Sequence, residues 1–509
     1  MPVALVIDTL SIQTYIFGSN KLKENIGGSY IIEELVYKEM IPKALKDAGV
    51  SNGLDLKKWK DEPEVYRLNN HPQEQVEVGY IGGGNALLLF RKESDSKEFI
   101  KAYSRLMLTH FPGLKTAFGL EEFNYEAGEG YETFRKRLNE NLIHNRNFSA
   151  AQVQPFKHGI AEDCPWTNEA QETKDSQSGS LISQMAASRV NLVKGAQKVL
   201  LEKFKNQIGE EFSFTDDLDQ LGQPDDKGYV AIVHADGNGM GQRFIGCQSL
   251  ADTRKLSAGV IDYADKVMQG LIGYIVSLFQ GEKPRLDWEL EQDKESEKRF
   301  LPIRPLIIGG DDITFVCEGR LGVHLAEKLL EYMHQIPING QPIHACAGVA
   351  IVHTKYPFYK AYQLAEELTK RAKDASRGEV GGSWLEYMIS TGGFSGPLKE
   401  IITDQFTVAG RGTLKSDPYR VDGSQATLPQ LHNGMKVFAD KWPRNKIKDL
   451  RDALRKDEAH QNYFLTEMDA RKLSLPGEKD NGKTLWKEGK TPYYDMIELI
   501  DFYPESLLS

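Results

Sequence analysis

Two adjacent carboxylates, Asp311 and Asp312, lie between two apolar runs in residues 306–318. The preceding Gly309 and Gly310 can supply the positive φ values of a tight turn, so the segment predicts a β-hairpin that carries both carboxylates at its tip. Glycines there also leave backbone room for a large anionic ligand. A solvent-exposed turn fits the same residues, because Gly and Asp are common turn formers.

A third carboxylate, Asp236, ends the apolar run of residues 229–236, which predicts a buried strand. In a ferredoxin-like sheet the first strand lies beside the central hairpin, so Asp236 can converge with Asp311 and Asp312. Three unpaired carboxylates repel one another, and a divalent cation relieves that repulsion. Oxygen-only ligands favour Mg²⁺ or Mn²⁺, and two such ions can activate a hydroxyl and steady a leaving pyrophosphate. The predicted chemistry is nucleotidyl transfer.

Small and basic residues supply candidate phosphate contacts near these carboxylates. Gly237 and Gly239 follow Asp236, and their backbone N–H groups can approach a phosphate, although Asp-Gly-Asn-Gly is also an ordinary turn. Residues 364–377 predict a helix with cations on successive turns. Lys373 is the candidate triphosphate contact there, with Lys370 and Arg377 as helpers. A solvated helical face explains the same charges without a ligand.

The elements that must position these residues occur twice. Residues 3–8 predict a strand, followed by helices, strands near 76–81 and 85–90, a helix over about 95–110 and a strand near 116–119. The second series has a strand at 229–236, a helix over roughly 251–280, the hairpin at 306–318, a helix around Leu325 and Leu329, and a strand at 343–352. Each series predicts a βαββαβ unit.

The spacing of landmarks supports a duplication. Asp236 lies 228 residues after Asp8, and Asp311 lies 227 residues after Gly84. We therefore predict an α+β protein with two ferredoxin-like palm domains plus a helical C-terminal domain. Two unrelated α/β domains are the alternative. The first unit has Gly84 and Asn85 where the second has Asp311 and Asp312, and an amide does not replace an anionic ligand. The first site is therefore expected to be catalytically silent.

Composition shifts divide the chain further. We predict a degenerate first palm domain at 1–150, a linker with a helical insertion at 151–227, a second palm domain with the active site at 228–395, and a mainly helical domain at 396–509. Within the insertion, residues 160–185 read as a loop and 188–205 as a helix. Residues 477–483 predict an exposed loop.

Bulk properties exclude several classes of protein. The 509 residues carry a formal net charge of −10, which argues against a surface that attracts nucleic acid everywhere. The four cysteines form no CxxC pair, so a reduced cytoplasmic protein without a structural zinc site is expected. No apolar stretch is long enough to span a membrane, and the start of the chain does not resemble a signal peptide.

Taken together, these motifs resemble the CRISPR type III large subunit, the Cmr kind in particular. Residues 8–17 (Asp-Thr-Leu-Ser-Ile-Gln-Thr-Tyr-Ile-Phe), 21–23 and 27–30 look like the start of its first palm domain. Residues 235–241, the Gly-Gly-Asp-Asp hairpin, 347–353 and 372–373 look like its second palm. The similarity covers about 1–120 and 228–400, with a weaker helical match beyond.

The resemblance implies an activity and a set of residues. That family joins ATP into cyclic oligoadenylates with 3′–5′ linkage, using divalent metal on the hairpin. Carried over, Asp236, Asp311 and Asp312 would hold Mg²⁺ or Mn²⁺, and a helix start around Gly27, Gly28 and Ser29 would face the second nucleotide across the palm–palm cleft.

Two departures from the family pattern limit what can be carried over. Family members often begin with a nuclease domain built on a His-Asp pair, whereas this sequence has no His-Asp dipeptide. The usual cysteine pairs between the palms are also missing. DNA cleavage is therefore not expected, and either a stand-alone synthase or a complex subunit fits.

The leading hypothesis is an Mg²⁺-dependent nucleotidyltransferase that makes a cyclic oligonucleotide signal, from ATP, in antiviral defence. Its rival is a non-catalytic scaffold that binds guide or target RNA, or partner CRISPR type III subunits, and keeps nucleotide only as a ligand. A diguanylate-cyclase-like enzyme is a more distant third, because the Glu-Phe that would follow the hairpin in that family is absent.

Overall fold

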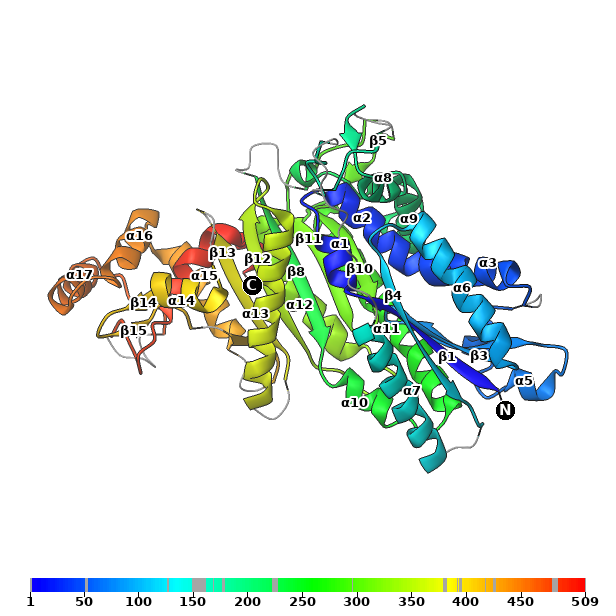
Figure 1. The fold of residues 1–509 in the computed structure, drawn as a ribbon. Helices are drawn as coiled ribbons and strands as arrows, with labels where there is room; N and C mark the ends of the chain where they lie inside the picture. The colour runs from blue at the N-terminus through cyan, green and yellow to red at the C-terminus, as the bar shows by residue number, and fades with distance from the viewer. Residues whose placement is uncertain are drawn as a thin grey trace.

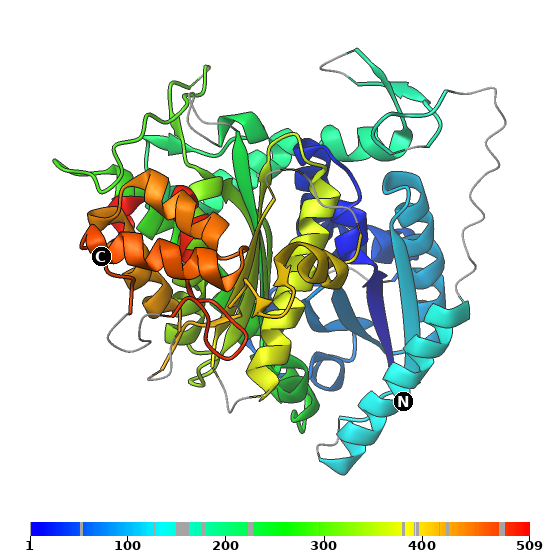
Figure 2. The same ribbon diagram turned by 90° about the vertical axis from the view of Figure 1, so that its left-hand side faces the viewer.

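The computed structural model describes residues 2–50, 54–125, 128–148, 162–167, 169–175, 179–221, 228–294, 296–378, 382–390, 392, 396–416, 418–423, 427–477 and 484–508. Helices and strands alternate along the chain, so the predicted α+β class is confirmed. Two sheets form the body, and the helices of the C-terminal region lie at one end of it (Figures 1 and 2). Residues 478–483 of the predicted loop at 477–483 lie outside the described residues.

The first sheet has the order β2-β3-β1-β4 and is apolar on both faces. Its strands are β1 (Val3–Leu10), β2 (Val76–Gly82), β3 (Asn85–Phe90) and β4 (Lys115–Glu122). Alternate residues of β1 belong to two separate buried clusters, one shared with α6 (Glu93–His110) and the other with α7 (Glu129–Phe148). A strand buried on both faces reads as a continuous apolar run, which is why residues 3–7 are recognisable in the sequence.

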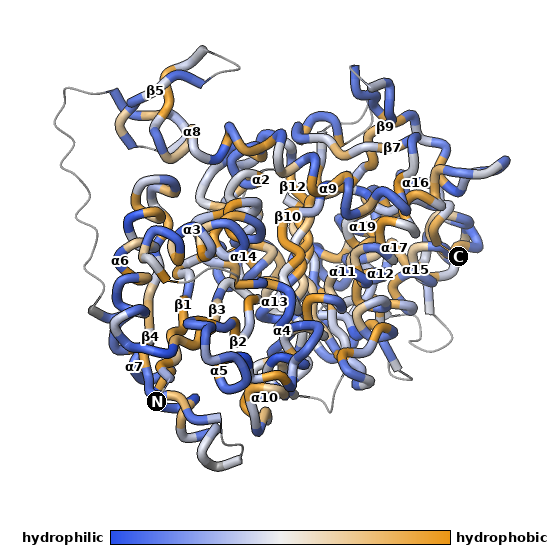
Figure 3. Tube along the Cα trace, turned by 90° about the vertical axis from the view of Figure 1, so that its right-hand side faces the viewer, coloured by the Kyte–Doolittle hydropathy of each residue, from blue (hydrophilic) through white to orange (hydrophobic). Residues whose placement is uncertain are grey.

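The second sheet has the order β10-β11-β8-β12-β13-β16. Its strands are β8 (Tyr229–Gly237), β10 (Ile303–Gly309), β11 (Asp312–Glu318), β12 (Ala345–His353), β13 (Trp384–Ser390) and β16 (Tyr419–Arg420). Helix α12 (Gly322–Gln335) packs near Val349, and α13 (Phe358–Gly378) packs against Gly348, so the two helices cover opposite faces. Hydrophobic residues follow β10 through the centre of the molecule (Figure 3).

The hydrogen-bond registers of the two sheets correspond closely. Asp8 pairs with Asn85 on β1 and β3, as Asp236 pairs with Asp312 on β8 and β11. The register shift in the first hairpin falls between residues 78 and 80, and that in the second falls between 305 and 307. These positions are again 227 residues apart, so the two hairpins share their pairing and their irregularity.

The long helix α11 (Leu250–Phe279) lies between the two hairpins. Ser249 caps its first turn by accepting from the backbone N–H of Asp252, which fixes where the helix begins. Arg254 is buried and donates to the carbonyl oxygens of Val78, at 2.7 Å, and Gly79, at 3.1 Å, both on β2. It also lies 3.5 Å from the buried Glu77. The sheets are therefore joined through a buried polar contact as well as through apolar packing.

Shorter elements complete the chain. The N-terminal part contains α1 (Ile12–Phe17), α2 (Leu22–Tyr30), the π-helix η1 (Ile31–Glu39), α3 (Met40–Asp47), α4 (Lys58–Asp61) and α5 (Arg67–Asn70). Between the sheets lie β5 (Thr173–Lys174), β6 (Leu181–Ile182), α8 (Gln184–Val190), α9 (Val193–Ile208), β7 (Phe212–Ser213) and η2 (Leu218–Gln220). Beside or within the second sheet region are α10 (Met240–Ile245), β9 (Arg299–Phe300) and η3 (Gly319–Leu321). The C-terminal region contains α14 (Leu398–Phe406), β14 (Thr407–Val408), β15 (Gly412–Thr413), α15 (Leu428–Lys441), α16 (Arg444–Ala453), α17 (Glu458–Ala470), α19 (Tyr493–Leu499), η4 (Ile500–Phe502) and η5 (Glu505–Leu507).

Candidate active site on the second hairpin

The three predicted carboxylates lie on neighbouring strands of the second sheet. Asp312 begins β11 directly opposite Asp236, which is the penultimate residue of β8. Asp311 sits in the turn, and its carbonyl oxygen accepts from the backbone N–H of Gly237 at 3.0 Å. Gly310 adopts φ 71°, the conformation that a tight hairpin needs at its first turn position. The fold thus places the three residues beside one another, as the sequence predicts.

The electrostatics of the site are those of an under-neutralised acidic cluster. Burial, followed by the charge of Asp236, raises the pKa of Asp311 to about 6. The same two causes raise the pKa of Asp312 to about 7. The Oδ1 atom of Asp312 is buried and accepts no hydrogen bond. His234 Nδ1 lies 3.3 Å from that oxygen, but it is hydrogen-bonded to Thr314 Oγ1 at 2.9 Å, and burial lowers the pKa of His234. A neutral ring does not balance the carboxylate.

Two polar side chains contact the cluster from other elements. The ammonium group of Lys373, on α13, forms an ion pair with Asp236. Gln13 Nε2, on α1 of the N-terminal unit, donates to Asp312 Oδ2 at 3.3 Å. The first contact places Lys373 at the carboxylates, and its predicted contact with a triphosphate stays a prediction. The second shows that the N-terminal unit reaches the hairpin of the other sheet.

These residues fit a hard divalent cation in their chemistry. All three side chains offer only carboxylate oxygens, which suit Mg²⁺ or Mn²⁺, and one buried oxygen lacks a partner. An added Cβ at Gly237 would lie 2.8 Å from the Cβ of Asp311, so this glycine leaves the space that the Asp311 side chain occupies. The three carboxylates do not meet a stricter test, in which one ligand atom from each residue lies within 4.8 Å of the others. Another cluster among the described residues does meet it.

Two cavities lie near the carboxylates. One, of about 550 Å³, lies between the two sheets and is lined by Gly309, Gly310 and Asp311 on one side and by Asp8 and Asn85 on the other. The second, of about 320 Å³, lies beside α13 and is lined by Asn238, Gly239, Arg243, Pro342, His344, Lys373, Ser376 and Arg377. Of the predicted phosphate-contact residues, Gly309 and Gly310 line the first cavity, Gly239, Lys373 and Arg377 line the second, and Gly237 lines neither.

The basic residues of α13 differ in their surroundings. Lys373 is partly buried at the carboxylates, whereas Arg377 is largely exposed and pairs with Asp374 at 3.2 Å. Lys370 is exposed and does not line either cavity. Of the three cations, only Lys373 contacts the acidic cluster.

Gly27, Gly28 and Ser29 do not lie where the sequence predicts. The helix begins at Leu22, so the predicted helix start at these residues is wrong; they form the end of α2 and run on into the π-helix. All three are buried, and the structure does not bring them to either cavity. An added Cβ at Gly27 would lie 2.1 Å from the carbonyl oxygen of Arg189, so the glycine permits close packing with α8. Ser29 Oγ donates to the carbonyl of Leu306 on β10.

The first hairpin has the same backbone pairing as the second but carries no carboxylate at its tip. Asp8 occupies the position equivalent to Asp236, and burial raises its pKa, with a smaller opposite effect from Arg146, which lies 3.5 Å away. Asn85 stands opposite it on β3, and Gly84 adopts φ 76° in the turn. One carboxylate, already facing an arginine, is a poor site for a divalent cation.

Sequence reasoning missed the polar residues that support the site. Gln13 lies within the quoted motif of residues 8–17, but nothing in its spacing indicates a contact 299 residues away. Thr369 Oγ1 donates to the carbonyl of His234 at 2.9 Å, and Asn238 Nδ2 donates to Ser376 Oγ at 3.2 Å. These contacts tie α13 to β8. Such residues can be identified only once α13 is packed on the sheet.

Comparison with known proteins supports the resemblance. Residues 229–381 match the family model described as Cas10/Cmr2, second palm domain. Among curated proteins, no match is found. Similar solved structures include a Csm1-Csm4 cassette in complex with pppApApA (14% identity, 98% of this chain and 69% of that chain covered, TM-score 0.54) and one in complex with cA4 (14%, 98% and 69%, TM-score 0.53). The Csm1-Csm4 subcomplex of a type III-A CRISPR-Csm interference complex is a further match (15%, 98% and 69%, TM-score 0.50).

The match extends over nearly the whole described chain and includes both sheets and the C-terminal helices. No helix among the described residues combines the length and apolar character needed to cross a bilayer. Residues 229–381 thus resemble the second palm domain of Cas10/Cmr2, and the chain has the fold seen in these Csm1-Csm4 structures.

Proposed function

We propose that this protein is an Mg²⁺- or Mn²⁺-dependent nucleotidyltransferase that makes cyclic oligonucleotides, from ATP, as an antiviral defence signal. The observation that carries the proposal is the acidic cluster on β8 and β11, in which Asp312 keeps a buried oxygen without a hydrogen bond. A buried, unneutralised carboxylate is costly unless a cation completes it. The similar structures are complexes with pppApApA and cA4, which suggests adenylates as the ligands to test.

Each residue has a separate task in this proposal. Asp236, Asp311 and Asp312 would hold the cation, and Lys373, which pairs with Asp236, would neutralise phosphate charge. When bound, the cation lowers the pKa of the attacking 3′-hydroxyl and neutralises charge on the leaving pyrophosphate. Gly309 and Gly310 leave the wall of the 550 Å³ cavity bare, so a nucleotide can approach the hairpin backbone. Gln13 orients Asp312 through its amide hydrogen bond.

We further propose that the first sheet is a second, silent palm domain. Its strand order, registers and β-bulge match those of the second sheet, and Asp8 and Asn85 line the shared cavity. The domain limits of 1–150, 151–227, 228–395 and 396–509 belong to this proposal. In it, the cavity between the sheets holds the nucleotide that donates the 3′-hydroxyl, and Gly27, Gly28 and Ser29 serve packing rather than contact.

The test is turnover of ATP. The full chain is incubated with ATP and Mg²⁺, alone and with a Csm4-like partner and target RNA, and pyrophosphate and oligoadenylates are measured by mass spectrometry. We expect products from the wild type, and a loss of at least about a hundredfold in an Asp311→Asn, Asp312→Asn variant. Asp440→Asn, at an exposed position on α15, is the matched control. Equal turnover by the double variant would contradict the proposal.

A partner subunit is a separate part of the proposal. The similar structures are Csm1-Csm4 assemblies, so a subunit of the Csm4 kind is the partner to test here, together with guide and target RNA. If the chain copurifies with RNA and a partner and binds ATP without turning it over under any of these conditions, the scaffold function replaces the enzymatic one.

A further inference from the structure

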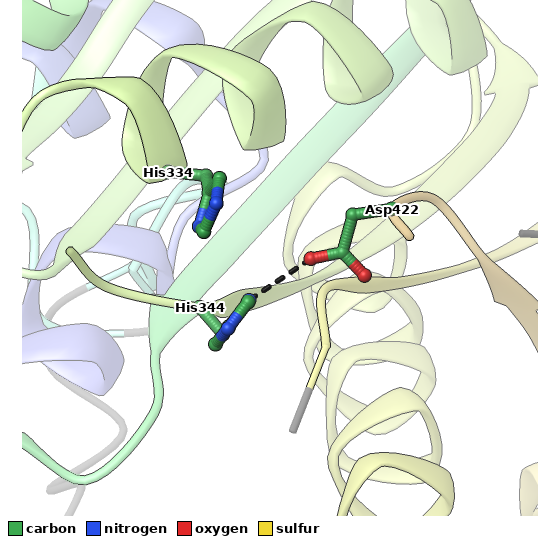
Figure 4. A group of neighbouring side chains, drawn as sticks. All are labelled: His334, His344 and Asp422. Atoms are coloured by element: carbon green, nitrogen blue, oxygen red, sulfur yellow. Dashed lines mark hydrogen bonds and ion pairs between the residues drawn. The ribbon is translucent and has the colours of Figure 1, made fainter. Parts of the chain in front are cut away.

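A second cluster of metal-ligating side chains lies away from the three aspartates. His334 is in the last turn of α12, His344 directly precedes β12, and Asp422 follows β16. Figure 4 shows the three side chains gathered between these elements. One ligand atom from each lies within 4.8 Å of the others, and they form the only group of this kind among the described residues. Residues 78 positions apart in the chain are thus brought to one point.

The hydrogen bond of His334 is typical of a metal ligand. His334 Nδ1 lies 3.3 Å from the carbonyl oxygen of Ile343, so the ring donates there and leaves Nε2 with its lone pair. Ligating histidines in proteins almost always place their second ring nitrogen against such an acceptor. His344 Nδ1 lies 2.9 Å from Asp422 Oδ2, so these two side chains already contact each other, and that contact would be exchanged for bonds to the ion. The two rings are also stacked, with centroids 4.7 Å apart and planes at 22°.

The donor set selects the metal. Two imidazoles and one carboxylate suit Zn²⁺ and related transition metals, whereas the all-oxygen cluster on the hairpin suits Mg²⁺. Bonds of about 2.0 Å in a tetrahedral site place ligand atoms about 3.3 Å apart, and the ligand atoms of these three residues lie within 4.8 Å of one another. The His344 and Asp422 side chains are 38% and 22% exposed, so an ion can enter from solvent. Arg420 Nε lies 3.5 Å from Asp422 Oδ1 and competes for the other carboxylate oxygen.

We propose that His334, His344 and Asp422 form a zinc site, with a water molecule as fourth ligand. The ion would fasten the segment after β16 to the start of β12. His344 also lines the 320 Å³ cavity together with Lys373, and its carbonyl accepts from the backbone N–H of Asn238 at 2.8 Å. A zinc ion here therefore holds one wall of the cavity next to the acidic cluster, without belonging to that cluster.

Metal content tests the site directly. The full chain is stripped with a chelator, titrated with Zn²⁺ and analysed for bound metal after desalting. We expect one equivalent in the wild type, and affinity lower by at least about tenfold in His344→Gln and in Asp422→Asn. His460→Gln is the matched control, because His460 pairs with Asp457 at 2.8 Å in an exposed His–Asp pair that belongs to no such three-residue group. Asp312→Asn is the second control and should keep its zinc.

A spectroscopic measurement removes dependence on the variants. Co²⁺ added to the stripped wild type should give the visible absorption of a four-coordinate ion, and one equivalent of Zn²⁺ should abolish it. If the wild type retains no stoichiometric zinc and shows no such absorption, the site is refuted. Equal zinc binding by wild type, His344→Gln and Asp422→Asn would refute it as well. Loss of zinc in Asp312→Asn alone would place the ion on the hairpin instead.

Discussion

Replacing Asp312 with asparagine should stabilise the metal-free protein while removing its response to Mg²⁺. The side chain is 30% exposed, yet its Oδ1 is buried without a hydrogen bond, and burial and the charge of Asp236 raise its pKa to about 7 from 3.8. When the pKa of an aspartate is raised by folding, the free energy of unfolding falls as the pH rises, because the carboxyl ionises at a lower pH in the unfolded chain than in the folded protein. Asparagine keeps the shape and removes the charge.

The size of the effect follows from the two pKa values. Each tenfold change in proton affinity corresponds to about 1.4 kcal/mol, so at pH 8, above both values, the charge costs about 4 kcal/mol. Because the pKa of Asp311 is raised too and the two carboxyl groups titrate together, a gain of about 2–4 kcal/mol is expected for Asp312→Asn. At pH 5 the cost in the wild type falls to about 1.7 kcal/mol, so the gain should shrink by more than half.

The assay is thermal unfolding in a chelator and in Mg²⁺, at pH 8 and pH 5. In chelator at pH 8, the variant should unfold at least about 2 °C above the wild type. Mg²⁺ should raise the unfolding temperature of the wild type, since a cation at a hundred times its dissociation constant adds about 2.7 kcal/mol, and should have little effect on the variant. Asp440→Asn should leave both responses unchanged. If Asp312→Asn is less stable than the wild type in chelator at pH 8, the electrostatic reasoning is wrong.

Three further outcomes are expected from packing and burial elsewhere. Gly237→Ala places a Cβ 2.8 Å from that of Asp311, so Mg²⁺-dependent turnover should fall at least about tenfold and urea unfolding should show a loss of about 1–3 kcal/mol. Arg254→Met leaves the buried Glu77 without its cation, and stability measured in urea should fall by about 3–5 kcal/mol. Burial lowers the pKa of His324 to about 3, so the unfolded chain takes up this proton first below pH 6.5. Urea unfolding should therefore show a loss of about 2 kcal/mol between pH 7.5 and pH 5 from this residue alone.

Controls separate these causes from general damage. Gly241→Ala is the partner of Gly237→Ala, because an added Cβ at Gly241 meets no atom within 4 Å, and equal effects of the two would contradict the steric explanation. Adding Glu77→Gln to Arg254→Met should recover part of the lost stability; no recovery would mean that the charge is not the cause. His324→Gln should show a shallower pH dependence than the wild type, and an unchanged slope would assign the proton uptake to other groups.

The sequence predicts the strands that carry the site better than the side chains that surround it. Residues 229–236 and 306–318 are apolar runs broken by Asp and Gly, and such runs are recognisable because strands buried on both faces tolerate few polar residues. The equal spacing of Asp8 and Gly84 from their counterparts predicts corresponding positions, and the hydrogen-bond registers agree with it. The apolar runs and the equal spacing can both be recognised from adjacent residues or from the repeat, without knowledge of tertiary contacts.

Contacts set by tertiary packing were not predictable in this way. Gln13 reaches Asp312 only because α1 packs on α13, where the ring of Phe17 lies 3.9 Å from that of Tyr362. The family resemblance implies that Gly27 and Gly28 face a nucleotide, but glycine serves close approach to a ligand and close approach to another helix equally well. Only the positions of α8, beside Gly27, and of α1, beside Gly28, distinguish the two uses.

A steric feature of the first hairpin adds to the missing charge in our proposal that this hairpin is silent. Both central residues of its turn, Gly83 and Gly84, have positive φ, as in a type I′ turn, whereas in the second hairpin only Gly310 does, as in type II′. A Cβ at Gly84 would lie 2.0 Å from the Cδ1 of Ile12. Restoring aspartate at residues 84 and 85 would therefore strain the turn and displace Ile12, the residue next to Gln13. Residues of α1 therefore contact both hairpins, because Ile12 fills the space beside Gly84 and the neighbouring Gln13 donates to Asp312.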